Sequence, residues 1–417
     1  MLQVSASEGT TIWRDPRALA LLFAASMTVM ANATISPALP GLEKLFAGDP
    51  NAALLTRLLV PAPSLAVVFV APLAGLWADR FGKRLMLLVG IFVFVAAGTA
   101  GLYLPSLPSI FASRLVLGVA VAMIMTAQTA LIGDYFAAAR RNAFMGLQVS
   151  ARNFGGLTFI TLGGWLALAS PHLPFAIYAL PLLFLPLIWR AVGEPVHGAA
   201  ATVSQDLHAT DGHAAWPLLI LALAGLQMTT NMIFFMMPTQ LPFFLSALGQ
   251  ESALMSGTAL GALTLTGGCI ALFYGRIKRK LAFSGTYALG YGLFGLGFAC
   301  LSGAGSVWPV LLGAALVGAG YSIVTPTFVA VALDLAPARR RGIGAGILTT
   351  SVFLGQVFSV FASTPSIAAF GYDGTFCATA LLLGGMAGVA GAIRALAIVR
   401  AAASADPDHG LPAEPRQ

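Results

Sequence analysis

The sequence contains 417 residues, of which 58% are hydrophobic and 9% are charged, and its mean hydropathy is +0.87. A soluble domain carries about 25% charged residues, so this composition excludes a soluble protein and predicts an all-α polytopic membrane protein embedded in a lipid bilayer. The net charge of +7 forms no basic stripe on a soluble domain, so we expect no nucleic-acid partner. The three cysteines lie singly in apolar runs without metal-ligand spacing, and we expect no disulfide, metal or other cofactor.

Runs of about 20 apolar residues can cross the hydrocarbon core of a bilayer as helices. The sequence contains twelve such runs, near residues 17–39, 55–77, 85–104, 109–134, 143–167, 174–192, 216–244, 252–274, 282–302, 307–333, 343–368 and 374–397. One polar stretch, which holds three of the five histidines, separates the sixth run from the seventh. The predicted organisation is a bundle at 1–192, a cytoplasmic linker at 193–215, a second bundle at 216–400 and a disordered cytoplasmic tail at 401–417.

The basic residues predict the orientation of these spans. Eighteen of the 22 Lys and Arg residues fall on one side of the predicted membrane, whereas only Lys44 and Arg57 fall on the other. Cytoplasmic loops carry an excess of Lys and Arg. We therefore expect a multi-pass protein of the cytoplasmic (inner) membrane with both termini in the cytoplasm.

Similar residues recur at a fixed offset of 200 positions. A repeat over that distance indicates two homologous halves, and hence two pseudo-symmetric six-helix bundles. The matched residues include Gly118 and Gly318, Asp134 and Asp334, Gly146 and Gly346, and Gly155 and Gly355.

Residues 75–84 form a dense charged turn, Gly-Leu-Trp-Ala-Asp-Arg-Phe-Gly-Lys-Arg, between the second and third predicted spans. Gly75 lets two helices approach closely because it has no side chain, and Asp79 can accept hydrogen bonds from a helix N-terminus. Gly82 lets the chain reverse. The bases of the turn either stay among the lipid headgroups or pair with carboxylates; they are Arg80, Lys83 and Arg84. An ordinary basic cytoplasmic turn is the simpler alternative.

This turn resembles the signature loop of the major facilitator superfamily, and the two six-span halves fit that family along the whole chain. Arg114-x-x-x-Gly118 resembles its fourth-span motif, and residues 32–40 resemble the first-span ending of its drug-transporter-like twelve-span branch. The resemblance implies that Asp79 latches the cytoplasmic side against the eleventh span and that Lys83 pairs with Asp134. It implies a gate that forms in the outward-open state and breaks in the inward-open one, in a monomeric transporter. Arg279 replaces the acid in the second half, which cannot make the same latch.

Two arginines lie within predicted spans, where a charge costs about 2.5–3.5 kcal/mol. Arg152 and Gln148 share a helix face at i, i+4 spacing, and either arginine could line a central cavity and hold an anionic group. The alternatives are snorkelling of Arg152 toward headgroups and a structural role for Arg114 beside helix-end carbonyls or Asn32. In the second half, similar polar residues either contact substrate or join helices. The predicted substrate-binding residues are Arg152, Arg114, Asn32, Gln148, Gln227, Asn231 and Tyr321.

These features predict a secondary active transporter that moves a small organic solute, anionic or amphipathic, by alternating access. A proton-driven multidrug efflux pump is the alternative within the class, and proton coupling is left open. No Asp or Glu lies well inside a span, and Phe159-Ile160 stand where drug exporters of the family carry Gly-Pro; both features count against that alternative. A channel would need rings of carbonyls or charges, and an embedded enzyme would need a catalytic constellation. We expect neither.

Overall fold

The computed structural model describes residues 15–136, 138–194, 215–337 and 340–404, and these ranges contain helices and turns without a strand. The predicted linker is therefore largely outside the described residues, as are the first 14 residues and the tail from residue 405. The elements are α2 (Pro16–Ala33), η1 (Ser36–Ala38), α3 (Leu39–Leu45), α4 (Ala52–Leu58), α5 (Ala62–Phe81), α6 (Lys83–Thr99), η2 (Ala100–Leu102), α7 (Leu107–Tyr135), α8 (Ala138–Ala167), η3 (Leu173–Ala179), α9 (Pro181–Ala191), α10 (Trp216–Ala247), α11 (Ala253–Ser302), α12 (Val307–Leu335) and α13 (Arg341–Ser404).

By length and composition, eight helices of the described ranges can cross a membrane, or nine if the bent pair α4 and α5 counts as one span. Two of these helices are long enough to hold two predicted spans each. α11 contains a break at Ala282 (φ 52°), and α13 contains one at Gly371 (φ 68°). Gly371 falls between two predicted spans and Ala282 is the first residue of one, so the structure is compatible with twelve, and the number itself stays a prediction. α13 runs to Ser404, a few residues beyond the start of the predicted tail.

Local sequence explains where the first helices begin and end. The side chain of Asp15 accepts a hydrogen bond from the backbone N–H of Arg17 (2.9 Å), and Pro16 occupies the first helical position, where its missing N–H costs nothing. α5 ends at Gly82, whose φ of +91° lets the chain turn directly into α6.

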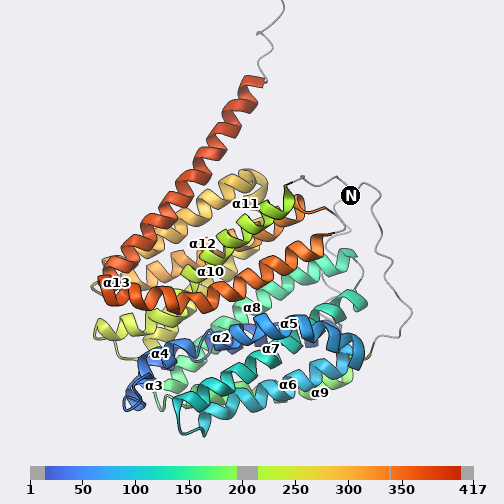
Figure 1. Cartoon of the computed structure of the whole chain (residues 1–417), viewed down its shortest axis with the longest axis vertical. Coiled ribbons are helices and arrows are strands. Elements are labelled where there is room, and N and C mark those ends of the chain that lie inside the picture. Colours follow the sequence, from blue (N-terminus) through green and yellow to red (C-terminus); the bar gives the residue numbers. More distant parts are fainter. Residues whose placement is uncertain (1–14, 137, 195–214, 338–339, 405–417) are drawn as a thin grey trace, which may run out of the picture.

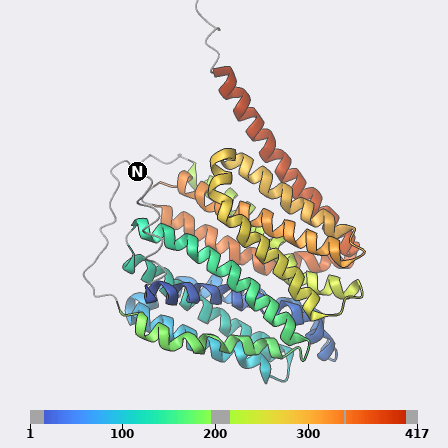
Figure 2. The same ribbon diagram turned by 180° about the vertical axis from the view of Figure 1, so that it is seen from behind.

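The helices form two groups (Figure 1). We call α2 to α9 the N-terminal half and α10 to α13 the C-terminal half. Each half surrounds an apolar core of its own, although Phe235 and Phe243 of α10 join the first core and Ile160 of α8 joins the second. α8 lies along α11 behind the plane of Figure 1, as Figure 2 shows. The part of α13 after Gly371 leaves the rest of the bundle at an angle (Figure 1).

Close helix contacts recur at the same offset as the sequence repeat. A Cβ atom on Gly118 would lie 2.2 Å from the carbonyl oxygen of Pro63, and one on Gly318 would lie 1.9 Å from that of Leu263. Such distances require glycine, because a real Cβ would force the helices apart. A second pair of close contacts recurs at the same offset. A Cβ on Gly90 would lie 3.0 Å from the Ile124 side chain, and one on Gly290 would lie 2.5 Å from the Val324 side chain.

The helix bundle has two ends that differ in charge. The basic end carries residues 80–84, 190–194 and 276–282, and the opposite end carries residues 34–61, 100–107 and 247–253. Among the described residues, the hydrogen bonds, ion pairs and close glycine approaches that join the halves run from the opposite end to mid-helix. Of these contacts, the one nearest the basic end joins Asn153 of α8 to Gly268 of α11. A Cβ on this glycine would lie 3.2 Å from the Cβ of the asparagine. The described conformation is therefore joined at its opposite end.

Candidate functional site

Arg152 lies on α8 at the seam between the two halves. Gly155 packs against Ser26 of α2, and Asn153 packs against Gly268 of α11. With 3.6 residues per turn, position 152 falls on the face of α8 between these two contacts. It is also one residue from the contact between the halves that lies nearest the basic end. The chain thus places an arginine where the halves begin to separate.

The guanidinium of Arg152 has no acidic partner among the described residues. Its side chain is half-buried, and its Nε atom is buried without a hydrogen-bond partner. The three ion pairs of the described ranges use other bases, namely Lys44, Arg57 and Lys83. Gln148, one turn away on the same helix, is buried too. Both side chains therefore lie on α8, and the Nε atom of Arg152 is free to donate a hydrogen bond within the part of the chain that the structure describes.

The predicted polar residues of the C-terminal half come together between α10 and α12. The hydroxyl of Tyr321 donates to Oδ1 of Asn231 (2.8 Å), whose Nδ2 donates to the backbone oxygen of Gln227 (2.9 Å). The ring of Tyr321 stacks on Phe234 with a centroid separation of 3.6 Å. The side-chain oxygen of Gln227 is buried and has no hydrogen-bond partner within the described ranges. These residues form one cluster that can still accept a hydrogen bond.

Asn32 takes part in a contact between the halves. Its Nδ2 donates to Oε1 of Gln356 on α13 (3.2 Å) and to Oγ of Ser64 on α5 (3.4 Å), and the hydroxyl of Ser64 also donates to Gln356. Sequence reasoning missed Gln356, although a buried glutamine inside a predicted span was the available signal. Asn32 thus helps to hold the halves together in this conformation.

Arg114 differs from the expectation that it contacts substrate. Its side chain is 0% exposed and lies 4.8 Å from the ring of Phe175 and 4.6 Å from that of Tyr178. Both rings belong to η3, within the N-terminal half. The guanidinium has no hydrogen-bond partner among the described residues, and its attraction to the two ring faces compensates part of its burial. Solute cannot reach it in this conformation, so a structural role fits better.

The charged turn at the basic end is held by a residue that the sequence reasoning missed. The carboxylate of Glu194, just after α9, accepts hydrogen bonds from the backbone N–H groups of Lys83 (2.8 Å) and Arg84 (2.9 Å). These are the first two residues of α6, so the negative charge also meets the positive end of the helix dipole. The Arg84 side chain donates to the backbone oxygen of Trp189 (2.8 Å).

The expected contact between Lys83 and Asp134 is present, with 2.6 Å between Nζ and Oδ2. It joins α6 to α7 inside the N-terminal half. The resemblance implies a gate that breaks when the basic end opens, yet this pair is formed while the halves are joined at the opposite end. The pair therefore does not by itself report which side is open, because both partners move with the same half.

The other residues of the charged turn differ in their surroundings. A Cβ on Gly75 would meet no atom of the described residues within 4 Å, so the expected close helix approach is absent from the described part of this conformation. Arg80 is exposed and lies 5.6 Å from the ring centre of Phe81. Asp79 belongs to α5, but its side chain lies outside the described residues.

The sequence profile described as Major Facilitator Superfamily matches residues 21–360. The chain belongs to this superfamily. It is therefore a multi-pass membrane transporter and not an enzyme.

Curated relatives of this chain include drug-resistance proteins. Multidrug resistance protein 1 of Bacillus subtilis is 30% identical over 128 residues, which cover 30% of this chain and 33% of that protein. The chain thus matches about a third of that relative's length. The class E tetracycline resistance protein of Escherichia coli is 26% identical over 377 residues, 86% of this chain and 87% of that protein.

Solved structures show the same fold at low identity. The crystal structure of a D-xylose-proton symporter has a TM-score of 0.71 and 17% identity, covering 88% of this chain and 96% of that chain. The human organic anion transporter MFSD10 has a TM-score of 0.65 and 19% identity, covering 89% and 99%.

Proposed function

We propose that this member of the superfamily is a secondary active transporter of small organic anions that works by alternating access. In this proposal the basic end faces the cytoplasm, both termini lie there, and the protein acts as a monomer in the cytoplasmic membrane. The excess of Lys and Arg at the basic end supports the orientation.

The observation that carries the substrate class is the guanidinium of Arg152 at the seam of the halves, which has no ion-pair partner among the described residues. An arginine at membrane depth costs about 2.5–3.5 kcal/mol, and such residues usually pair with an opposite charge. No acid among the described residues does so here. A carboxylate or phosphate of the solute would supply the missing partner through charge-assisted hydrogen bonds.

The second half would complete the site with neutral hydrogen-bonding groups. When the halves move, Gln227 would offer a side-chain oxygen that is buried in this conformation and has no partner among the described residues, and Tyr321 would offer a ring beside Asn231. A solute that spans from α8 to α10 would touch both halves, as a transporter site between two bundles requires.

A ligand-stability screen on purified protein tests this proposal. Anionic solutes should raise the melting temperature, because a ligand of the folded state stabilises it by mass action. Arg152→Gln should weaken binding of the hit about 10- to 100-fold, the range expected for a lost hydrogen-bonded charge contact, and Arg152→Lys should retain more affinity. Equal affinity in the three proteins would refute the anion site. Uptake into proteoliposomes with and without a pH gradient then tests coupling to protons.

A proton-driven multidrug efflux pump is the second candidate, favoured by the drug-resistance relatives and by one apolar groove. This groove, of about 280 Å³, lies between α10 and α13 and is lined by Met228, Met232, Phe358, Phe361 and Ala362. Lipophilic cations would suit such a lining. Growth protection against them on overexpression, unchanged by Arg152→Gln, would favour this candidate over the first.

The charged turn would act when the basic end closes. In that state we expect the start of α13 to pack near Gly75 and Asp79, with Arg80 beside them. Disulfide formation between cysteines at Gly75 and Gly346, measured with and without ligand, tests this closure.

A further inference from the structure

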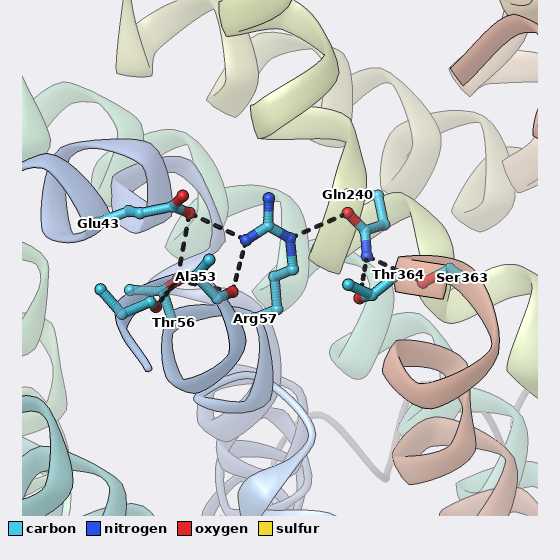
Figure 3. Close-up of polar contacts among 8 residues, drawn as sticks. Glu43, Ala53, Thr56, Arg57, Gln240, Ser363 and Thr364 are labelled. Atoms are coloured by element: carbon cyan, nitrogen blue, oxygen red, sulfur yellow. Dashed lines mark hydrogen bonds and ion pairs between the residues drawn. The ribbon is translucent and has the colours of Figure 1, made fainter. Parts of the chain in front are cut away.

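Arg57 of α4 connects the two halves at the opposite end (Figure 3). Its Nη1 atom pairs with Oε2 of Glu43 on α3 at 3.0 Å, and its Nε donates to Oε1 of Gln240 on α10 at 3.4 Å. Its guanidinium also lies 4.0 Å from the ring centre of Phe243. The side chain is only 15% exposed, so one arginine joins three helices in a place largely shielded from solvent.

The contact extends through Gln240 to a third part of the interface. The Nε2 atom of this glutamine donates to Oγ of Ser363 (2.9 Å) and to Oγ1 of Thr364 (3.2 Å), both on α13 (Figure 3). Gln240 stands between Pro238 and Pro242 of α10. Neither proline has an N–H to donate, so the α10 backbone hydrogen-bond ladder is weakened on both sides of this contact. Gln240, the partner of Arg57 in the C-terminal half, therefore lies on a deformable segment of α10.

The charges of this cluster are distributed unequally between the halves. Arg57 and its acid both belong to the N-terminal half, whereas its partners across the interface, Gln240 and Phe243, are neutral. The side chains of Arg57 and Glu43 are 15% and 30% exposed, and separating them would leave two partly shielded charges uncompensated. The halves can separate without breaking the Arg57–Glu43 pair, because both partners belong to the N-terminal half. The contact across the interface is a hydrogen bond and a cation–π contact, which are individually modest.

We propose that Arg57 is the gating residue of the opposite end: it closes that end by contacting Gln240 and Phe243, and it leaves them, still paired with Glu43, when that end opens. This inference rests on the proposed alternating-access function. It assigns the inter-half contact to Arg57 and the holding of its charge to Glu43.

The chain supplies a matched control at the same end. Lys44 of α3 and Glu251 also pair across the two halves, at 2.7 Å, but their side chains are 60% and 68% exposed. Exposed pairs contribute little because water screens them. Removing this pair should leave the closed state in place, whereas removing the Arg57 contact should not.

The test measures the distance between spin labels at Ala47 and Ala247, which are exposed on the two halves at this end. Cys269, Cys300 and Cys377 are first replaced by serine. Gln240→Met removes the acceptor while leaving the Arg57–Glu43 pair intact, and Arg57→Gln removes the base. Each should raise the ratio of the longer-distance population to the shorter one about fivefold, as loss of ~1 kcal/mol would. Lys44→Gln should leave the ratio unchanged.

The distances are measured in detergent-purified protein without solute, so they report the gate independently of the substrate. If the ratio stays unchanged in Gln240→Met and Arg57→Gln, both folded by melting curve and gel filtration, the gate is refuted. An equal rise in Lys44→Gln would also refute it, because any contact at the rim would then suffice. Unchanged solute uptake in all variants with shifted distances would count against the proposed function and not against the gate.

Discussion

In each half, a charged side chain makes hydrogen bonds with the backbone at the turn that follows the second predicted span. The two side chains carry opposite charges. In the N-terminal half the turn is at Gly82, and Glu194 accepts hydrogen bonds from the two N–H groups that begin α6. Exactly 200 positions later the turn is at Ala282, and Arg394 stands where Glu194 would be. The Arg394 side chain donates to the backbone oxygens of Leu281 and of Lys280 (3.4 Å for the latter).

The difference shows what each repeat retains. An acid meets the positive N-terminus of one helix in the first half, and a base meets the negative C-terminus of the preceding helix in the second. Both therefore complement a helix dipole at the same turn. Only the first turn is also tied to the fourth helix by an ion pair, since Asp334 has none among the described residues.

The largest expected effect on stability comes from two glycines, one in each half, that occupy equivalent positions of the repeat. Gly118→Ala and Gly318→Ala should each lower the free energy of unfolding by about 1–3 kcal/mol, because the new Cβ overlaps a backbone oxygen and overpacks the interface. Melting curves in detergent measure this. Gly133→Ala is the matched control, as a Cβ there meets no atom of the described residues within 4 Å, and it should be neutral or stabilising. A tolerated alanine at position 118 or 318 would contradict the described packing.

The two turns should respond with opposite signs to exchange of their residues. Gly82→Ala should destabilise by about 1–2 kcal/mol, because an L side chain rarely adopts φ +91° and its Cβ would lie 3.0 Å from Oε1 of Glu194. Ala282→Gly should stabilise by about 1 kcal/mol or less, since Ala282 has a φ of 52°. Changes in melting temperature of the same sign for the two substitutions would contradict this expectation.

Removing the charged side chain beside each turn should cost somewhat less. Glu194→Ala should lower stability by about 1 kcal/mol, typical of losing a helix N-cap, and Arg394→Met should have an effect of similar size. High salt should shrink both differences, as screening weakens exposed charge contacts. Salt-independent melting differences would show that packing, and not charge, holds the turns.

The smallest expected effect on stability is that of the ion pair at the first turn. The side chains of Lys83 and Asp134 are 26% and 27% exposed, and such pairs contribute about 0–1 kcal/mol. Lys83→Gln and Asp134→Asn should therefore melt close to the parent protein. A double-mutant cycle gives the coupling energy, and a value well above 1 kcal/mol would show a stronger link between α6 and α7.

Hydropathy and the fixed offset predict the membrane class and the two halves from sequence, because burial in lipid demands long apolar helices. The family is predicted by the resemblance of the charged turn at residues 75–84 to a known signature loop. The i, i+4 spacing also predicts that Arg152 and Gln148 share one face of a helix. It does not reveal that Arg114 stacks on Phe175 and Tyr178, since that contact joins segments about 60 residues apart. For Arg57 the sequence predicts only a position on the side of the membrane that carries fewer Lys and Arg residues. Its gating contacts depend on Gln240, which only the three-dimensional packing brings close.

One measurement tests reciprocal opening, the central claim, most directly. Spin labels at Arg190 and Arg279 report the basic end, and labels at Ala47 and Ala247 report the opposite end; all four residues are exposed. When a transported solute is added, the account predicts that one of the two distances shortens as the other lengthens. Distances that both stay fixed, or that change in the same direction, would contradict it.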